Sequence, residues 1–301
     1  VTLTETGPNI VAGALWGILY WMFDQPLAGS IPLSYAIVSL LSVILFHFTR
    51  RYDLFLFSQL LLILLLPFLL MIALGGFVSK TFLADPLTML RSGWTLLTEM
   101  GFARDIGMTV WRVLGGFAIA AALALPLGVL MGAYKPVEAF FEPFVSFARY
   151  LPASAFIPLL ILWVGIGESQ KLAVIFIGSF FQLVLMIAVT VGNTRRDLVE
   201  AAYTLGTSDR SLIRRVLIPG AAPEIAETLR MVLGWAWTYV IVAELIGASS
   251  GIGHMITDSQ ALLATDQIIF GIIVIGLIGL VSDLLFKWAN RSFFPWAQLG
   301  R

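Results

Sequence analysis

The chain has 301 residues, with 18 basic and 18 acidic side chains, so its formal net charge is zero. Hydrophobic residues make up 59% and charged residues only 12%, about half the charged share of a soluble domain. This composition excludes an ordinary soluble protein and indicates a polytopic membrane protein. The net charge of zero gives no reason to expect a nucleic-acid partner. The absence of cysteine excludes disulfides, thiol chemistry and thiolate metal sites.

Apolar runs that approach the roughly 20 residues needed to cross a bilayer are interpreted as spanning helices. The first two, Asn9–Phe23 and Ile31–Phe48, form a predicted extra hairpin within residues 1–53. The third run, Leu54–Val78, is the most lipid-like. Five further predicted spans are Thr109–Ala133, Phe140–Gly165, Lys171–Val191, Met231–Ala248 and Ile268–Lys287. The sequence therefore predicts an all-α membrane fold with seven or eight spans.

Three polar stretches separate these runs: an amphipathic stretch at Asp85–Ile106, a charged loop at Asn193–Arg230 and a Gly/Ser-rich loop at Ser249–Asp266. Basic residues follow the second, fourth, sixth and eighth spans, which puts them on one side of the membrane. The positive-inside rule makes that side the cytoplasm. Both termini are therefore expected to be cytoplasmic.

The charged loop carries the most specific pattern in the chain. Asp197–Leu205 favours a helix with an acidic first turn, and Gly206 stands where a C-cap glycine belongs. Ser211–Ile218 predicts a second short helix, which Pro219-Gly220 is expected to end. A loop that only sets topology needs arginines but not this capped helical pair. The pattern therefore indicates a docking site for a soluble partner.

The spacing of Glu200-Ala201-Ala202, Gly206 and Val216–Pro219 resembles the EAA loop of ABC importer permeases. Other stretches resemble the same family, and two of them its nitrate, sulfonate, taurine and bicarbonate branch: residues 109–117, 125–128, 152–168 and 243–253. The resemblance covers about residues 79–301, with Leu54–Val78 in the place of the first core span. It implies a type I importer permease of about six core spans, which would place a transmembrane domain at 54–301 and its coupling loop at 193–230.

The resemblance also implies a function and partners. The chain would import a small solute, an anion such as nitrate, a sulfonate, taurine or bicarbonate, by alternating access in the inner membrane. A separate ATP-binding ABC subunit would hold ATP and Mg²⁺, because this sequence has no G-x-x-x-x-G-K-[ST] motif. A periplasmic or lipid-anchored solute-binding protein, a second permease copy and membrane lipid complete the expected partners. The expected ATPase-coupling residues are Glu200, Ala201, Ala202, Gly206, Arg210 and Pro219.

Five residues are candidates for the transport pathway: Arg112, Arg149, Pro152, Pro158 and Glu244. The two prolines predict a bent helix, which lines a cavity or serves only packing. The two arginines would attract an anion, or would snorkel at helix ends. Glu244 is the most internal acid. It is expected to be protonated or to pair with a cation such as Arg230 or Arg149, rather than to contact a substrate.

Two other classes of function stay open from the sequence. One is an ion-coupled secondary transporter or channel whose cytoplasmic loop is regulatory. The other is a membrane anchor without transport, because residues 1–78 weakly resemble the membrane anchors of some bacterial nucleotide cyclases. No catalytic, cofactor-binding or metal-binding residue is predicted in any of these readings.

Overall fold

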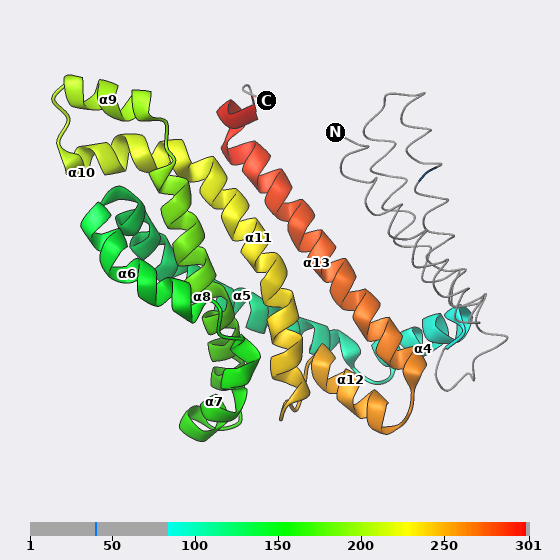
Figure 1. Cartoon of the computed structure of the whole chain (residues 1–301). Coiled ribbons are helices and arrows are strands. Elements are labelled where there is room, and N and C mark those ends of the chain that lie inside the picture. Colours follow the sequence, from blue (N-terminus) through cyan, green and yellow to red (C-terminus); the bar gives the residue numbers. More distant parts are fainter. Residues whose placement is uncertain (1–39, 41–83, 299–301) are drawn as a thin grey trace. The chain divides into compact units, whose positions relative to one another are not determined.

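The computed structural model describes residue 40 and residues 84–298, and all regular structure there is helical (Figure 1). The helices are α4 (Pro86–Thr98), α5 (Phe102–Ala133), α6 (Lys135–Ala148), η1 (Ala153–Phe156), α7 (Ile157–Val164), α8 (Glu168–Gly192), α9 (Arg196–Thr204), α10 (Asp209–Leu212), the π-helical turn η2 (Ile213–Leu217), α11 (Ile218–Leu245), α12 (Ile252–Ala261), α13 (Thr265–Phe293) and η3 (Pro295–Gln298).

The chain divides into two compact units, Val1–Ser92 and Gly93–Arg301, and the second carries the features described below. The predicted hairpin within residues 1–53 and the predicted span 54–78 lie outside the described residues. The extra hairpin and the sixth core span therefore stay predictions.

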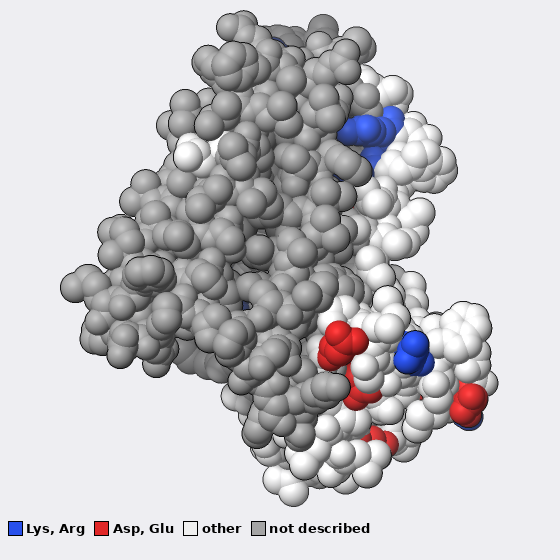
Figure 2. Space-filling model, turned by 90° about the vertical axis from the view of Figure 1, so that its right-hand side faces the viewer, with Lys and Arg blue, Asp and Glu red and all other residues white. Residues whose placement is uncertain are grey.

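Four helices of the described region are long and apolar enough to cross a membrane: α5, α8, the continuous helix Asp209–Leu245 and α13. A fifth span results if α6 and the η1–α7 pair are counted together. The outer surface fits this, because α13 exposes large apolar side chains such as Leu277, Val281 and Leu285. Figure 2 shows a basic patch and, apart from it, a group of acidic and basic side chains, with described surface between them that carries no charged atoms. The protein is a multi-pass membrane protein with an all-α fold.

The predicted span Phe140–Gly165 is wrong as a single helix, because α6 and η1–α7 meet at a bend of 80°. The chain leaves α6 after Ala148, and Pro152 takes an extended backbone conformation before η1. Pro158 then occupies the first turn of α7, where its missing N–H breaks no helical hydrogen bond. The bend itself was predicted from these two prolines.

The predicted helix end at Pro219-Gly220 is also wrong. The helix that starts at Asp209 runs on to Leu245, and Pro219 lies in the first turn of α11. The π-helical turn η2 lies directly before it. A π turn shifts the hydrogen-bonding register, so the proline ring enters the helix without displacing an i−4 carbonyl.

The predicted Gly/Ser-rich loop Ser249–Asp266 contains the helix α12. Its start is capped by side chains from outside the helix, two of them more than 140 residues away in sequence. The backbone N–H groups of Gly251, Ile252 and Gly253 donate to Asp105, Thr109 and Glu244 respectively, at 2.7–2.9 Å. These bonds satisfy donors that the first turn of a helix leaves free.

The core lies between α5, α8 and α11. Glycines of α5 allow close contact with α8: a Cβ on Gly116 or Gly128 would lie 2.8 Å from Ile175 or Ile187. Both α8 and α11 run between the same two ends of this unit (Figure 1). At one end they connect to α9 and α10, and at the other to α7 and α12.

Candidate functional site

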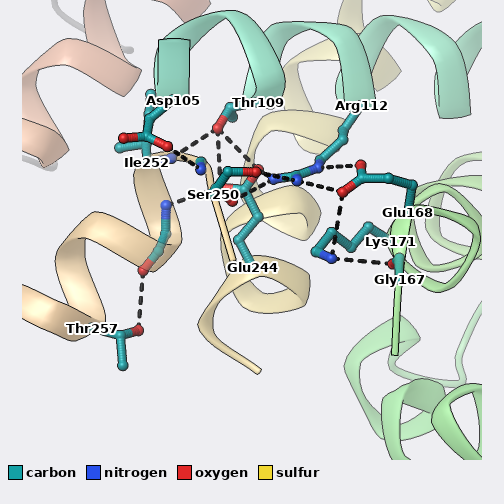
Figure 3. Close-up of polar contacts among 12 residues, drawn as sticks. Asp105, Thr109, Arg112, Gly167, Glu168, Lys171, Glu244, Ser250, Ile252 and Thr257 are labelled. Carbon is teal, nitrogen blue, oxygen red and sulfur yellow. Dashed lines mark hydrogen bonds and ion pairs between the residues drawn. The ribbon is translucent and has the colours of Figure 1, made fainter. Parts of the chain in front are cut away.

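A buried guanidinium organises the end of the unit near α12 (Figure 3). Arg112 of α5 is completely buried. Its Nε and Nη2 each donate to Glu168 at 2.6 Å, and its Nη1 donates to Glu244 at 2.7 Å. The carbonyl and hydroxyl of Ser250 accept two further bonds at 2.7 and 2.9 Å. Arg112 therefore links α5 to α8, α11 and the turn before α12.

Glu244 of α11 is the second buried charge of this group. Its carboxylate accepts from the Thr109 hydroxyl at 2.9 and 3.0 Å and from the Gly253 N–H at 2.9 Å, in addition to Arg112. The Thr109 oxygen in turn accepts from the N–H of Ile252. A buried carboxylate is tolerated when a cation and several donors surround it, as they do here.

We call Thr109, Arg112, Glu168, Glu244 and Ser250 the ion-pair cluster. Lys171 completes its charge balance: its Nζ lies 3.8 Å from Glu168 and donates to the carbonyl of Gly167. Arg112 and Glu244 have no exposed side-chain surface, whereas 45% of the Glu168 side chain is exposed. The charges of Arg112 and Lys171 thus balance those of Glu168 and Glu244.

Glycine is required where the cluster meets the turn before α12. Gly251 has φ +110°, and a Cβ there would lie 2.5 Å from both Arg112 Nη1 and the Glu244 carboxylate. A Cβ on Gly253 would lie 2.6 Å from Glu244. The Gly251-Ile252-Gly253 sequence is therefore part of the cluster's construction.

The EAA segment, residues 195–219, lies at the other end of α8 and α11 (Figure 1). The predicted first helix and its glycine turn are confirmed by α9 and Gly206, whereas the predicted second short helix is the start of the long helix Asp209–Leu245. Gly206 has φ +76°. The N–H of Gly206 donates to the carbonyl of Tyr203, and the N–H of Thr207 donates to the carbonyl of Ala202. This is a Schellman cap, the ending expected from a glycine at this position.

The EAA segment presents both charged and apolar side chains to solvent. Glu200, Ala201, Arg210 and Pro219 are exposed, whereas Ala202 is buried in the core. The sequence reasoning missed three exposed apolar residues of α9 and its cap: Leu198, Tyr203 and Leu205. Leu205 is 85% exposed. A large apolar side chain in so polar a segment is the signal that points to a docking surface.

An exposed ion pair opens the EAA segment. Arg195 bonds the Asp197 carboxylate through two nitrogens, and this bond lowers the pKa of Asp197 below its usual value. Farther along, the Tyr203 hydroxyl donates to Asp209 at 3.1 Å, which raises the pKa of Tyr203. The second bond joins α9 to α10 across Gly206.

A cavity of about 310 Å³ lies at the bend between α6 and α7. Its walls are residues 148–154 together with parts of α8 and α11. Of the predicted pathway residues, Arg149 and Pro152 line it, whereas Arg112, Pro158 and Glu244 do not. Arg149 donates to the Tyr150 hydroxyl at 3.0 Å, and its guanidinium lies 4.8 Å from the centre of that ring.

The structure brings two of the predicted residues, Arg112 and Glu244, into direct contact. The expected pairing of Glu244 with Arg230 or Arg149 is wrong, because Arg230 pairs with Glu227 and Asp283. Sequence reasoning did not assign Thr109 and Ser250 to this group, because their partners lie more than a hundred residues away. Within residues 84–298 no three potential ligands among His, Asp and Glu are grouped to hold a metal ion.

Comparison with known proteins places these features in a family. The family described as "Binding-protein-dependent transport system inner membrane component" matches residues 124–296, more than half of the chain. A protein of Brucella abortus (strain 2308) named "Probable ABC transporter permease protein" is 38% identical over 232 residues, covering 75% of this chain and 93% of its own. The taurine transport system permease protein of Escherichia coli (strain K12) is 30% identical over 224 residues, covering 73% and 82%.

A solved structure of the methionine ABC transporter MetNI shares the fold. It matches with a TM-score of 0.58 at 18% identity, covering 64% of this chain and 95% of that chain. Permeases of the matched family work with a separate ATPase and a solute-binding protein, and ATP is bound by the ATPase. The chain belongs to the binding-protein-dependent ABC transporter permeases, as a membrane subunit that is not itself an ATPase and carries no cofactor.

Proposed function

We propose that this permease imports a small anion by alternating access, driven by an ATPase that docks on the EAA segment. The observation that carries the proposal is the course of α8 and α11. Each helix has one end at the EAA segment and the other at the ion-pair cluster. A displacement that the ATPase imposes at one end therefore reaches the other through two packed helices.

The surface of the EAA segment supports docking. Glu200 and Arg210 offer exposed charges of opposite sign, and Leu205 offers an exposed apolar contact. The Schellman cap at Gly206 holds α9 and α10 in a fixed relation, so the surface is formed before the partner arrives. Ala201 lies on the exposed side of α9, while Ala202 anchors that helix to the core.

The orientation and assembly follow from the same segment. The segment holds five arginines: Arg195, Arg196, Arg210, Arg214 and Arg215. By the positive-inside rule we place this end in the cytoplasm, and the span count expected from the sequence puts both termini on the same side. A single chain offers one EAA segment, whereas paired ATPases need two. We therefore include a second permease copy in the assembly, with a periplasmic or lipid-anchored protein delivering the solute.

The choice of an anion rests on two observations. A relative named for the transport of taurine, which carries a sulfonate group, is similar over most of this chain. Arg149 lines the cavity at the α6–α7 bend, where its recorded contacts in the described part of the chain are with Tyr150. Arg112 does not support an anion site, because its N–H groups donate to Glu168, Glu244 and Ser250 within the protein.

Reconstitution tests the proposal. The permease, an ABC ATPase that co-purifies with it and a solute-binding protein are placed in vesicles, and uptake of radiolabelled taurine, nitrate and bicarbonate is measured with and without ATP. ATP-dependent uptake of one of these solutes, each of which carries an anionic group, is the expected result, together with two permeases for each pair of ATPases by mass measurement. Uptake that needs an ion gradient but neither the ATPase nor ATP would instead support a secondary transporter.

A further inference from the structure

We propose that the cavity at the α6–α7 bend is a binding site for a small organic oxyanion, a sulfonate or carboxylate with a short apolar body. The inference rests on the proposed function and assigns it a site. The cavity is defined by three segments that are distant in sequence: the break at residues 148–154, the middle of α8 and the last turns of α11. Its volume of about 310 Å³ is in the range of small-molecule pockets.

The charge of the lining selects an anion. Among the described residues that line the cavity, Arg149 alone carries a charge. Its contacts within the described part of the chain are a hydrogen bond to the Tyr150 hydroxyl and the face of the same ring. The guanidinium thus keeps most of its donors for a ligand, and its planar fork matches the oxygens of a sulfonate or carboxylate.

The contrast with Arg112 strengthens this assignment. Arg112 is fully buried and its Nε, Nη1 and Nη2 all donate to partners within the protein. Arg149 is exposed and lines an open space. Of the two arginines expected in the pathway, only Arg149 is placed to meet a solute.

The remaining walls favour an organic anion over a bare inorganic ion. Gln182, Thr238 and Tyr239 add neutral donors and acceptors that do not compete with Arg149 for charge. Phe181 and Val242 add apolar surface beside them. An ion without an apolar part would leave this surface facing water, whereas a short alkyl chain covers it.

The position of the cavity suits transport. It lies at a break between two helices, and broken helices at membrane depth are tolerated where they line a cavity. Two of its walls, α8 and α11, also join the EAA segment to the ion-pair cluster. A movement of either helix therefore changes the shape of the site, which is what alternating access of a bound solute requires.

The absence of cysteine from the chain makes a direct test simple. Gln182→Cys places a single thiol in the cavity wall of the full-length permease. Its reaction is followed with two methanethiosulfonates, one carrying a sulfonatoethyl group and one a trimethylammonioethyl group. Each rate is normalised to that of 2-mercaptoethanol. We expect the sulfonate reagent to be favoured by about tenfold or more, because a cationic cleft concentrates anions.

Matched variants identify the source of the preference. Arg149→Gln in the Gln182→Cys background should remove it, and Arg149→Lys should keep it. Ethanesulfonate at millimolar concentration should slow the labelling, whereas ethylammonium should not. Thr238→Cys serves as a second reporter, and gel filtration checks that every variant is folded.

Equal normalised rates, a preference that survives Arg149→Gln, or two thiols that react with neither reagent would each overturn the inference. The labelling uses the permease alone, without ATPase or solute-binding protein. A negative result therefore rejects this site and leaves ATP-driven import to the reconstitution test. Failure of reconstituted import with normal anion-selective labelling would reject the proposed function instead.

Discussion

The two ends of α8 and α11 are built on opposite principles. At the ion-pair cluster, charged groups from three helices and one turn satisfy one another, and Arg112 and Glu244 have no exposed side-chain surface. At the EAA segment, Glu200, Arg210 and Leu205 face solvent. The comparison shows that one end holds the helices together internally, while the other leaves its binding groups for a second protein.

The comparison is tested most strongly by removing the central cation of the cluster. Arg112→Leu leaves Glu244 buried without its counter-ion, which should cost about 3–5 kcal/mol of unfolding free energy. Arg149→Leu is the matched control and should cost less than about 0.5 kcal/mol, because that side chain is exposed. Reversible unfolding in mixed detergent micelles measures both. Equal losses for the two arginines would show that the cluster has no special role.

A second variant disturbs the cluster without removing a charge. Gly251→Ala forces a side chain into a backbone with φ +110° and places a Cβ 2.5 Å from Arg112 and Glu244. We expect a loss of about 1–3 kcal/mol. Gly234→Ala in α11 is the control, because nothing lies within 4 Å of its Cβ. The argument fails if Gly251→Ala unfolds at the same denaturant concentration as Gly234→Ala.

The EAA segment is tested through its turn. Gly206→Val strains a residue with φ +76° by about 1–2 kcal/mol, which should tilt α10 against α9 and reduce co-purification of the ATPase. Glu200→Lys should also weaken docking by reversing an exposed charge. Neither variant changes a spanning helix, so membrane insertion should be normal. Gly107→Val, in a helix with open space around the Cβ, is the control. If both variants bind the ATPase and transport at the normal rate, the segment serves only to set the orientation of the protein in the membrane.

The smallest effect on stability is expected at Leu205. Because 85% of this residue is exposed, Leu205→Ser should change the unfolding free energy by no more than about 0.5 kcal/mol. As an apolar contact of the proposed interface, Leu205 should nevertheless matter for docking: the affinity of the Leu205→Ser permease for the ATPase should fall by about tenfold. Titration of the ATPase against permease in nanodiscs measures this. Unchanged affinity would remove Leu205 from the docking surface.

The sequence predicted the EAA segment well because its signals are local. The acidic first turn of α9 and the turn glycine Gly206 lie within ten residues of each other and act through local backbone geometry. The exposure of Leu205 was not predictable, because periodicity alone does not show which face the core covers. The helix continues through Pro219 because a π-helical turn precedes it, and no local sequence pattern predicts a π-helical turn.

The ion-pair cluster was predicted only as separate charges. Arg112 and Glu244 were recognised as unusual within apolar runs, but they are 132 residues apart, and nothing local specifies that they meet. The same limit applies to α12, whose first turn is capped by Asp105, Thr109 and Glu244 rather than by its neighbours. Long-range packing of α5, α8 and α11 decides both features.

The length of α8 has a mechanical consequence. With 25 residues, a straight helix of this kind is about 37 Å long. Pivoting it by about 5° at the EAA segment moves its far end by about 3 Å, which is the length of a hydrogen bond. Glu168 lies at that far end, bonded to Arg112 at 2.6 Å. A rotation of this size is therefore large enough to make or break the contact between these two residues.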